Sequence, residues 1–159
     1  MTPLTDNPFA TLTIVVAPAI LTNATSVLCL GTGNRIARVV DRTRTLRAEL
    51  GRLGPESELR ESYLQQLGRM RVRAHLLLRG MRFFYASIGS FAASALISIF
   101  GALVATTAGE TTFYAIATLG LISGTVGVTG LVLGSMLMVR ETRLAVRFLE
   151  EEAELAPRI

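Results

Sequence analysis

The sequence contains no lysine and no tryptophan, and only one cysteine and one histidine among its 159 residues. A single cysteine, Cys29, excludes a disulfide within the chain and a CxxC metal site. His75 has no second metal-type ligand at useful spacing. The sequence also lacks a nucleophile elbow, paired carboxylates in its apolar runs and a complete nucleotide-binding glycine motif. We therefore expect no catalytic residue, no metal and no cofactor, and the chain is predicted not to be an enzyme.

Charged residues are also scarce, at 18% of the chain, whereas a soluble domain carries about a quarter. They are missing entirely from residues 7–34, 83–109 and 111–139. A helix rises about 1.5 Å per residue, so roughly 20 residues cross the hydrocarbon core of a bilayer. Each uncharged run is longer than this minimum. This pattern excludes an ordinary soluble domain and predicts three transmembrane helices.

The predicted fold is all-α, an integral membrane protein with a cytoplasmic antiparallel helical hairpin between the first and second transmembrane helices. The predicted parts are an external N-terminus (1–7), transmembrane helices (8–34, 83–107 and 113–139), the hairpin (35–82, with its turn near 53–57), a short external turn (108–112) and a cytoplasmic tail helix (140–159). A cleaved or lipidated first run is disfavoured, because no basic residue precedes it and the bulky Leu28 stands before Cys29.

The net charge of +4 is distributed unevenly along the chain. The hairpin segment, 35–82, holds twelve arginines against five acids, a charge of +7, whereas residues 1–7, the turn at Glu110 and residues 140–159 each sum to −1. Basic loops stay on the cytoplasmic side, so the hairpin and the C-terminus are predicted to be cytoplasmic and the N-terminus external. A segment held to the membrane at both ends and containing five acids is not expected to bind nucleic acid.

The hairpin segment shows two helical stripes of apolar or small side chains. The first stripe comprises Ile36, Val39, Thr43, Leu46, Leu50 and Leu53, and the second comprises Leu59, Tyr63, Leu67, Met70, Ala74, Leu77 and Met81. Their spacing of three and four residues predicts two packed helices that continue the membrane helices. Gly54 and Pro55 separate them, because glycine ends helices and proline cannot continue one.

Charged side chains near the membrane ends of the hairpin are expected to meet lipid. These residues, Arg35, Arg38, Arg42, Arg79 and Arg82, are predicted to contact lipid headgroups or to line a cytoplasmic vestibule. Four tail residues, Glu150, Glu151, Glu152 and Glu154, form an acidic patch. Because the patch and the hairpin lie on the same predicted side of the membrane, we expect them to pair, within one chain or between subunits.

Small residues follow helical spacing in the second and third runs. The predicted helix-packing residues are Ser90, Ser94, Ser98, Gly101, Gly120, Gly124, Gly127, Gly130 and Gly134. Small side chains let helix backbones approach closely, which favours helix association in lipid. A short turn joins these two runs, so part of each stripe is expected to pack within the chain. A three-span protein of this size buries little surface alone, and we therefore expect a homo-oligomer.

The first run is the most polar of the three. Its central polar residues, Thr22, Asn23, Thr25 and Ser26, have two interpretations. They either form interhelical hydrogen bonds that fix packing, or they line a pore in an oligomer. No ionisable side chain lies within any run, which argues against a proton-coupled transporter that uses an intramembrane carboxylate.

Over roughly residues 9–150 the chain resembles a bacterial membrane family, domain of unknown function 2721. The resemblance rests on NPFATLTIVVAPAILTNATSVLCLGTGNRIARVVDRTRTLRAEL and on LGRMRVRAHLLLRGMRFFYASIGSF. Its most specific parts are the APA at 17–19 and the stretch from Asn34 to Leu46. The resemblance implies a multi-pass protein of the bacterial inner membrane. It implies no activity, so no functional residue is carried over.

Two function classes remain open from the sequence. The first is a small homo-oligomeric channel or transport-like pore, with the polar first span at its axis and the arginine-rich hairpins as a vestibule. The second is a membrane-anchored structural or regulatory adaptor whose hairpin and acidic tail bind a cytoplasmic protein partner.

Overall fold

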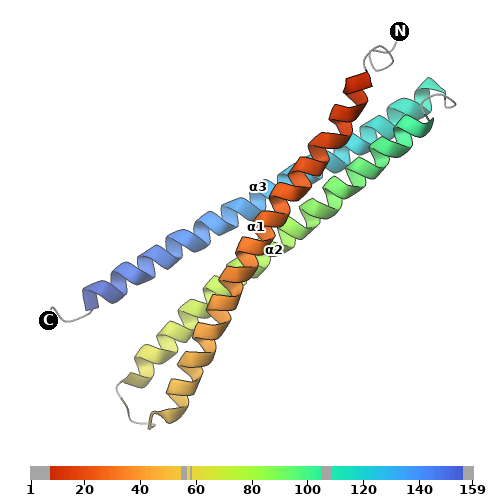
Figure 1. Cartoon of the computed structure of the whole chain (residues 1–159). Coiled ribbons are helices and arrows are strands. Elements are labelled where there is room, and N and C mark those ends of the chain that lie inside the picture. The colour runs from red at the N-terminus through yellow and green to blue at the C-terminus, as the bar shows by residue number, and fades with distance from the viewer. Residues whose placement is uncertain (1–7, 55–56, 58, 105–108, 156–159) are drawn as a thin grey trace. The chain divides into compact units, whose positions relative to one another are not determined.

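The computed structural model describes residues 8–54, 57, 59–104 and 109–155, with side chains from Val16 to Glu151 in these ranges. They form three long helices, α1 (Pro8–Arg52), α2 (Leu59–Val104) and α3 (Glu110–Leu155) (Figure 1). The all-helical prediction is thus confirmed for the described residues. The predicted N-terminus (1–7), residues 105–107 of the second span, residue 108 of the turn and residues 156–159 of the tail lie outside them.

Each helix continues from a predicted span into the adjoining charged segment without a break. α1 passes through Pro18, which has no N–H to donate to the preceding turn. α1 ends at Arg52, and beyond it the N–H of Ser57 donates to the carbonyl of Gly54. The Ser57 carbonyl then accepts from the Arg60 N–H in the first turn of α2.

α3 begins three residues earlier than the predicted start of the third span at residue 113. The carbonyl of Gly109 accepts hydrogen bonds from the N–H groups of Thr112 and Phe113, which closes the first helical turn. Glu110 lies in this turn, where a carboxylate is favourable beside the positive end of the helix dipole. Local capping therefore starts α3 inside the turn that the sequence predicts.

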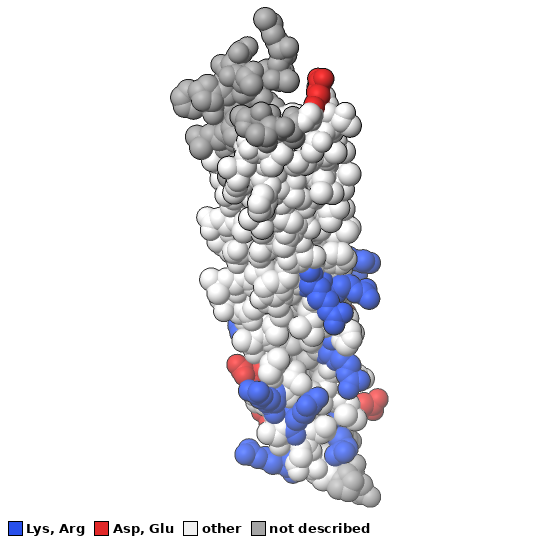
Figure 2. All heavy atoms as spheres, turned by 90° about the vertical axis from the view of Figure 1, so that its right-hand side faces the viewer, with Lys and Arg blue, Asp and Glu red and all other residues white. Residues whose placement is uncertain are grey.

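The chain divides into two compact units, and every helix contributes to both. Unit 1 contains residues 1–29 and 83–133, and unit 2 contains residues 30–82 and 134–159. The described residues of unit 1 contain a single charged side chain, Glu110. All of the arginines on the face shown in Figure 2 belong to unit 2, because unit 1 contains none.

In unit 1, α2 and α3 pack as an antiparallel pair through small residues. As the numbers rise along α3 they fall along α2, and the close pairs are Ile116 with Gly101, Gly120 with Ile97, Gly124 with Ser94, Gly127 with Phe91, and Gly130 with Ser87. At each glycine in these pairs a Cβ would lie within 3.4 Å of the partner residue. Side chains would therefore hold the helices further apart, as expected for small-residue packing in membranes.

Two hydroxyl groups join α2 and α3 directly. Ser94 donates to the carbonyl of Gly120 over 2.9 Å, and Ser123 donates to the carbonyl of Ser90 over 2.9 Å. Ser98 donates instead to the carbonyl of Ser94 on its own helix. Each interhelical bond depends on the close approach of the two backbones, because a serine side chain reaches only a short distance.

In unit 2, the two stripes of the hairpin face inward as predicted. Val39 and Leu46 of α1 and Leu77 of α2 are buried, and Leu46 and Leu77 have no exposed surface. The other stripe positions are half-buried except Leu59, which is exposed at the first residue of α2. Gly80 faces the carbonyl of Gly134 and the side chain of Met138, which brings α3 into the same core. Gly134 thus packs in unit 2.

Among the described residues, three helices are long and apolar enough to cross a membrane. Unit 1 leaves many large apolar side chains exposed, among them Leu103 at 69% and Leu121 at 72%. A monomeric soluble protein rarely exposes apolar patches larger than a few hundred Å². This surface is suited to lipid or to further helices.

We expect Gly127→Ala to destabilise the packing of α2 against α3. A methyl group at this position would lie 2.6 Å from the ring of Phe91. Phe91 is only 1% exposed, so its ring has little room to move. Overpacking of this kind costs roughly 1–3 kcal/mol. The measurement is the free energy of unfolding of the purified protein in detergent, determined by steric trapping.

Gly89→Ala is the matched control for this variant. A Cβ at Gly89 would meet nothing within 4 Å. The control should keep or raise the free energy of unfolding, because alanine is favoured over glycine inside a helix by roughly 0.5–1 kcal/mol. Equal losses in the two variants would show that the Gly127 contact is not special.

Candidate functional site, a buried carboxylate beside an arginine groove

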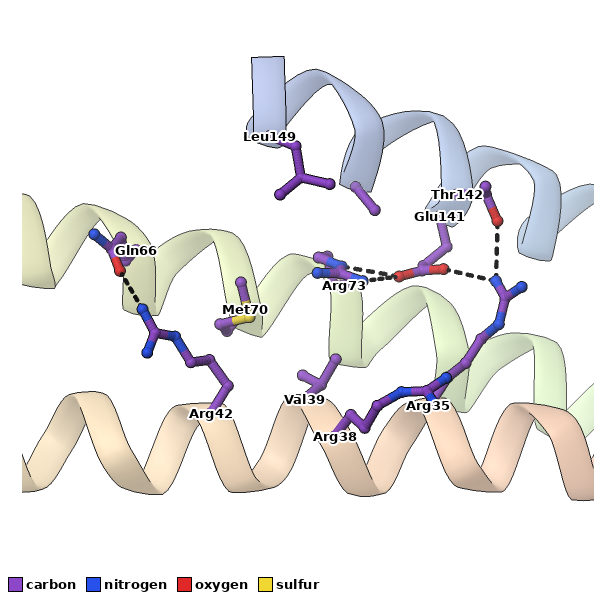
Figure 3. A pocket seen from close by; sticks show the side chains of 11 residues that line it. Arg35, Arg38, Val39, Arg42, Gln66, Met70, Arg73, Glu141, Thr142 and Leu149 are labelled. Atoms are coloured by element: carbon purple, nitrogen blue, oxygen red, sulfur yellow. Dashed lines mark hydrogen bonds and ion pairs between the residues drawn. The ribbon is translucent and has the colours of Figure 1, made fainter. Parts of the chain in front are cut away.

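The carboxylate of Glu141 on α3 is buried in unit 2, with 1% of its side chain exposed. Its Oε2 atom accepts from Nη1 of Arg35 on α1 over 3.2 Å. Its Oε1 atom accepts from Nε of Arg73 on α2 over 2.8 Å and lies 2.8 Å from Nη2 of the same guanidinium group. Figure 3 shows the two guanidinium groups on opposite sides of the carboxylate. We refer to Arg35, Arg73 and Glu141 as the Glu141 triad.

The Glu141 triad satisfies a charge that would otherwise be expensive to bury. An isolated ionised carboxylate is strongly disfavoured away from water, and charges are buried when they are paired and hydrogen-bonded. Both carboxylate oxygens have arginine donors, and Arg35 also donates to the hydroxyl of Thr142 over 2.9 Å. Since the three residues come from three helices, the triad fixes the position of α3 against the hairpin within unit 2.

The position of Glu141 follows from the helical pattern of α3. Leu137, Leu144 and Phe148 are half-buried, and together with Glu141 they recur at spacings of four, three and four residues. Glu141 therefore occupies a core-facing position of an otherwise apolar stripe. Reasoning from the sequence missed both Glu141 and Arg73, and the signal that could have revealed Glu141 is this acid within the stripe.

An open groove of about 480 Å³ lies beside the Glu141 triad in unit 2. It is lined by Arg35, Arg38, Val39 and Arg42 of α1, by Gln66, Met70 and Arg73 of α2, and by Glu141, Thr142, Ala145 and Leu149 of α3. We call it the arginine groove. The charged residues of its lining are four arginines and one glutamate, so its formal charge is +3.

The four arginines of the groove differ in how they are engaged. Arg35 and Arg73 belong to the Glu141 triad. Arg42 donates one long hydrogen bond of 3.4 Å to the amide oxygen of Gln66. Arg38 is exposed and forms no ion pair with any residue that the structure describes. The groove thus presents guanidinium groups that are available to an anion.

The acidic tail patch pairs with the hairpin of the same chain at Glu151. Its Oε2 atom lies 2.7 Å from Nη2 of Arg69, and the Arg69 guanidinium also stacks over the ring of Phe148 at 4.8 Å. This contact confirms the predicted pairing for Glu151. Glu150 is exposed, and the side chains of Glu152 and Glu154 lie outside the described residues.

The four polar residues singled out in the first run lie in unit 1 and face different directions. Thr25 is fully buried, and its hydroxyl donates to the carbonyl of Leu21. Thr22 and Ser26 donate to the carbonyls of Pro18 and Thr22 on their own helix. Asn23 is exposed. The four residues therefore do not form one polar surface on a single chain.

The five arginines predicted to meet lipid or to line a vestibule separate into two groups in unit 2. Arg35, Arg38 and Arg42 line the arginine groove. Arg79 and Arg82 are exposed outside it. No group of three or more His, Cys, Asp and Glu side chains that could hold a metal occurs in the described part of the chain.

The family described as "Protein of unknown function (DUF2721)" matches residues 15–151. The chain belongs to this family. The matched region includes most of α1, all of α2 and nearly all of α3, and so both the Glu141 triad and the arginine groove. Comparison with curated proteins and with solved structures finds no match.

We expect Glu141→Gln to destabilise the protein by about 2–3 kcal/mol. The substitution keeps the size of the side chain but leaves Arg73, which is 25% exposed, without its counter-charge. Breaking a fully buried pair costs roughly 3–5 kcal/mol, and the loss should be smaller here because Arg35 is 44% exposed and can turn toward water. Thermal unfolding in detergent measures this change.

Glu150→Gln makes the same chemical change at an exposed position of the same helix. It should alter the stability by less than about 0.5 kcal/mol. If Glu141→Gln were equally mild, the Glu141 triad would not be a stabilising contact.

Proposed function

We propose that the chain is a multi-pass protein of the bacterial inner membrane whose subunits form a homo-oligomer with a small channel or transport-like pore. Three helices that could cross a membrane and membership of the family support the membrane assignment. In this proposal the three uncharged helix segments cross the bilayer. The charged segments of unit 2, with all sixteen arginines of the chain, lie in the cytoplasm, and the N-terminus is external.

This orientation predicts a pattern of cysteine labelling in cells. In a Cys29→Ala background, Glu110→Cys should react with a membrane-impermeant maleimide added to intact spheroplasts. Gly54→Cys, which replaces an exposed residue, should react only after the membrane is permeabilised. Labelling of Gly54→Cys in intact spheroplasts would show that the topology is the opposite of the proposed one. Recovery of the protein in the soluble fraction would instead refute the membrane assignment itself.

The single observation that most favours an oligomer is the exposure of Asn23. Thr25 and Cys29 occupy the buried face of α1, and Asn23 lies about 200° around the helix from Thr25. Its neighbours on the outer face are apolar, with Ile20 and Val27 each more than 60% exposed. A carboxamide in hydrocarbon lacks hydrogen-bond partners, and asparagine side chains in membranes bond across helices. A second α1 would supply that partner.

The same placement supports a pore. If the outer faces of several α1 helices surround one axis, the Asn23 side chains form a polar ring between Ile20 and Val27. The hydroxyl groups of Thr22 and Ser26 already donate to their own helix, so the carboxamide is the group left to contact a permeating ion or solute. The apolar neighbours would make the ring a narrow constriction.

We expect Asn23→Leu to weaken the oligomer by about 0.6–2 kcal/mol, the range found for polar contacts between membrane helices. We also expect it to change ion flux through the purified protein in liposomes. Thr125→Val is the control, because it removes an exposed hydroxyl on α3 that donates only to the carbonyl of Leu121 on its own helix. Subunit counting in nanodiscs measures the oligomer.

The two measurements separate the parts of the proposal. An oligomer insensitive to Asn23→Leu would exclude α1 from the subunit interface. An intact oligomer that conducts no ion or small solute in liposomes would exclude the pore.

An adaptor is the second candidate, favoured by exposed aliphatic side chains on unit 2. Leu64 and Val72 of α2 are each 50% exposed and Leu149 of α3 is 65% exposed, although unit 2 holds nearly all the described charges. In an aqueous compartment such residues mark a contact surface. An oligomer without flux, together with one defined cytoplasmic protein that is released by Leu64→Glu, would favour the adaptor over the pore.

A further inference from the structure

We propose that the arginine groove is a binding site for the phosphate headgroup of an anionic phospholipid from the cytoplasmic leaflet. This inference rests on the proposed membrane insertion but not on a pore or an oligomer. The sequence alone suggests a general attraction between the hairpin arginines and anionic lipids. The structure narrows it to a groove lined by four arginines, of which Arg38 forms no ion pair with any described residue, and by an apolar wall.

The charge of the groove favours a phosphate ester. The Glu141 carboxylate is already held by Arg35 and Arg73, so it presents no unpaired negative charge to a ligand. Arg38 and Arg42 are one helical turn apart on α1, and residues at this spacing lie on the same face. Each guanidinium group can bind phosphate oxygens through forked hydrogen bonds, and both side chains line the groove.

The remaining wall of the groove favours a lipid over a free inorganic anion. Val39, Met70, Ala145 and Leu149 line it together with the polar residues, and Leu149 is 65% exposed. A small hydrated anion gains nothing from an apolar wall. A headgroup with its glycerol and the first part of an acyl chain would cover these side chains, and burial of apolar surface contributes about 25 cal/mol per Å².

The position of the groove residues in the chain favours the membrane surface as the source of the ligand. Arg35 follows the first uncharged run directly, and Glu141 and Thr142 stand two and three residues beyond the end of the third run. The groove therefore begins at the ends of the segments proposed to cross the bilayer. Headgroup phosphates lie at this depth on the cytoplasmic side, where anionic lipids attract basic residues.

The test measures binding of short-chain lipids to the purified full-length protein in a neutral detergent. Dioctanoyl phosphatidylglycerol is the anionic probe, dioctanoyl phosphatidylcholine is the zwitterionic probe, and inorganic phosphate is the probe without a lipid body. We expect saturable binding of phosphatidylglycerol with at least about tenfold preference over the other two. Each arginine beside an anionic headgroup contributes about a fivefold factor in affinity.

The double variant Arg38→Gln, Arg42→Gln should therefore weaken phosphatidylglycerol binding about 25-fold. Both residues are exposed and outside the Glu141 triad, so the variant should remain folded. The matched control, Arg47→Gln with Arg71→Gln, removes the same charge from exposed positions outside the groove. It should change the affinity less than about threefold.

Three outcomes would overturn the assignment. Equal weakening in the two double variants would indicate surface attraction without a site. Equal affinity for phosphatidylcholine would show that the net charge of the headgroup does not determine binding. Tight binding of inorganic phosphate alone would identify a soluble phosphate as the ligand. Failure of the membrane proposal would be recognised separately, because the labelling experiment above tests insertion without any lipid measurement.

Discussion

One carboxylate, that of Glu141, is shared by arginines from the two other helices of the chain, and the arrangement of unit 2 depends on it. The hairpin also has an apolar core, in which Leu46 of α1 and Leu77 of α2 are fully buried. The Glu141 triad stabilises the packing of α3 against the hairpin. It also determines which face of α3 meets the hairpin, since a buried charge has few acceptable partners. Arg69 adds a second contact further along, to Glu151 and Phe148. The arginine groove exists because the triad holds three helices around it while Arg38 remains without an ion-pair partner among the described residues.

Unit 1 is held together by a different kind of contact. Its α2 and α3 segments meet at glycines and serines, with two hydroxyl groups that donate across to backbone carbonyls. This suits a solvent of hydrocarbon, in which apolar side chains gain little by leaving lipid and close backbone approach provides the attraction. The two units are therefore ordered differently: charge pairing orders the arginine-rich unit, and close packing of α2 against α3 orders the nearly uncharged one. On α2 the boundary between the units, at 82/83, coincides with the start of the uncharged run.

Much of the fold could be predicted from the sequence, because it depends on patterns along single helices. The uncharged runs gave the three long apolar helices, and the spacing of residues such as Val39, Leu46 and Leu77 gave the buried faces of the hairpin. The Glu141 triad could not be predicted in the same way. Its arginines lie 106 and 68 residues away along the chain, and the periodicity of one helix does not specify which face of another it meets. Asn23 shows the same limit, because its polarity was evident but the face it occupies depends on which side of α1 the other helices cover.

Several hydroxyl side chains of unit 1 donate a hydrogen bond to the backbone carbonyl four residues earlier on the same helix. Thr22, Ser26, Thr118, Thr125 and Thr129 all do so. A threonine bonded in this way offers its surroundings mainly a methyl group, since its donor is already occupied. The polarity that such a helix presents to its neighbours is thus much lower than its composition suggests. A span rich in threonine can face hydrocarbon at little cost, and a single asparagine then has more influence on assembly than several hydroxyl groups together.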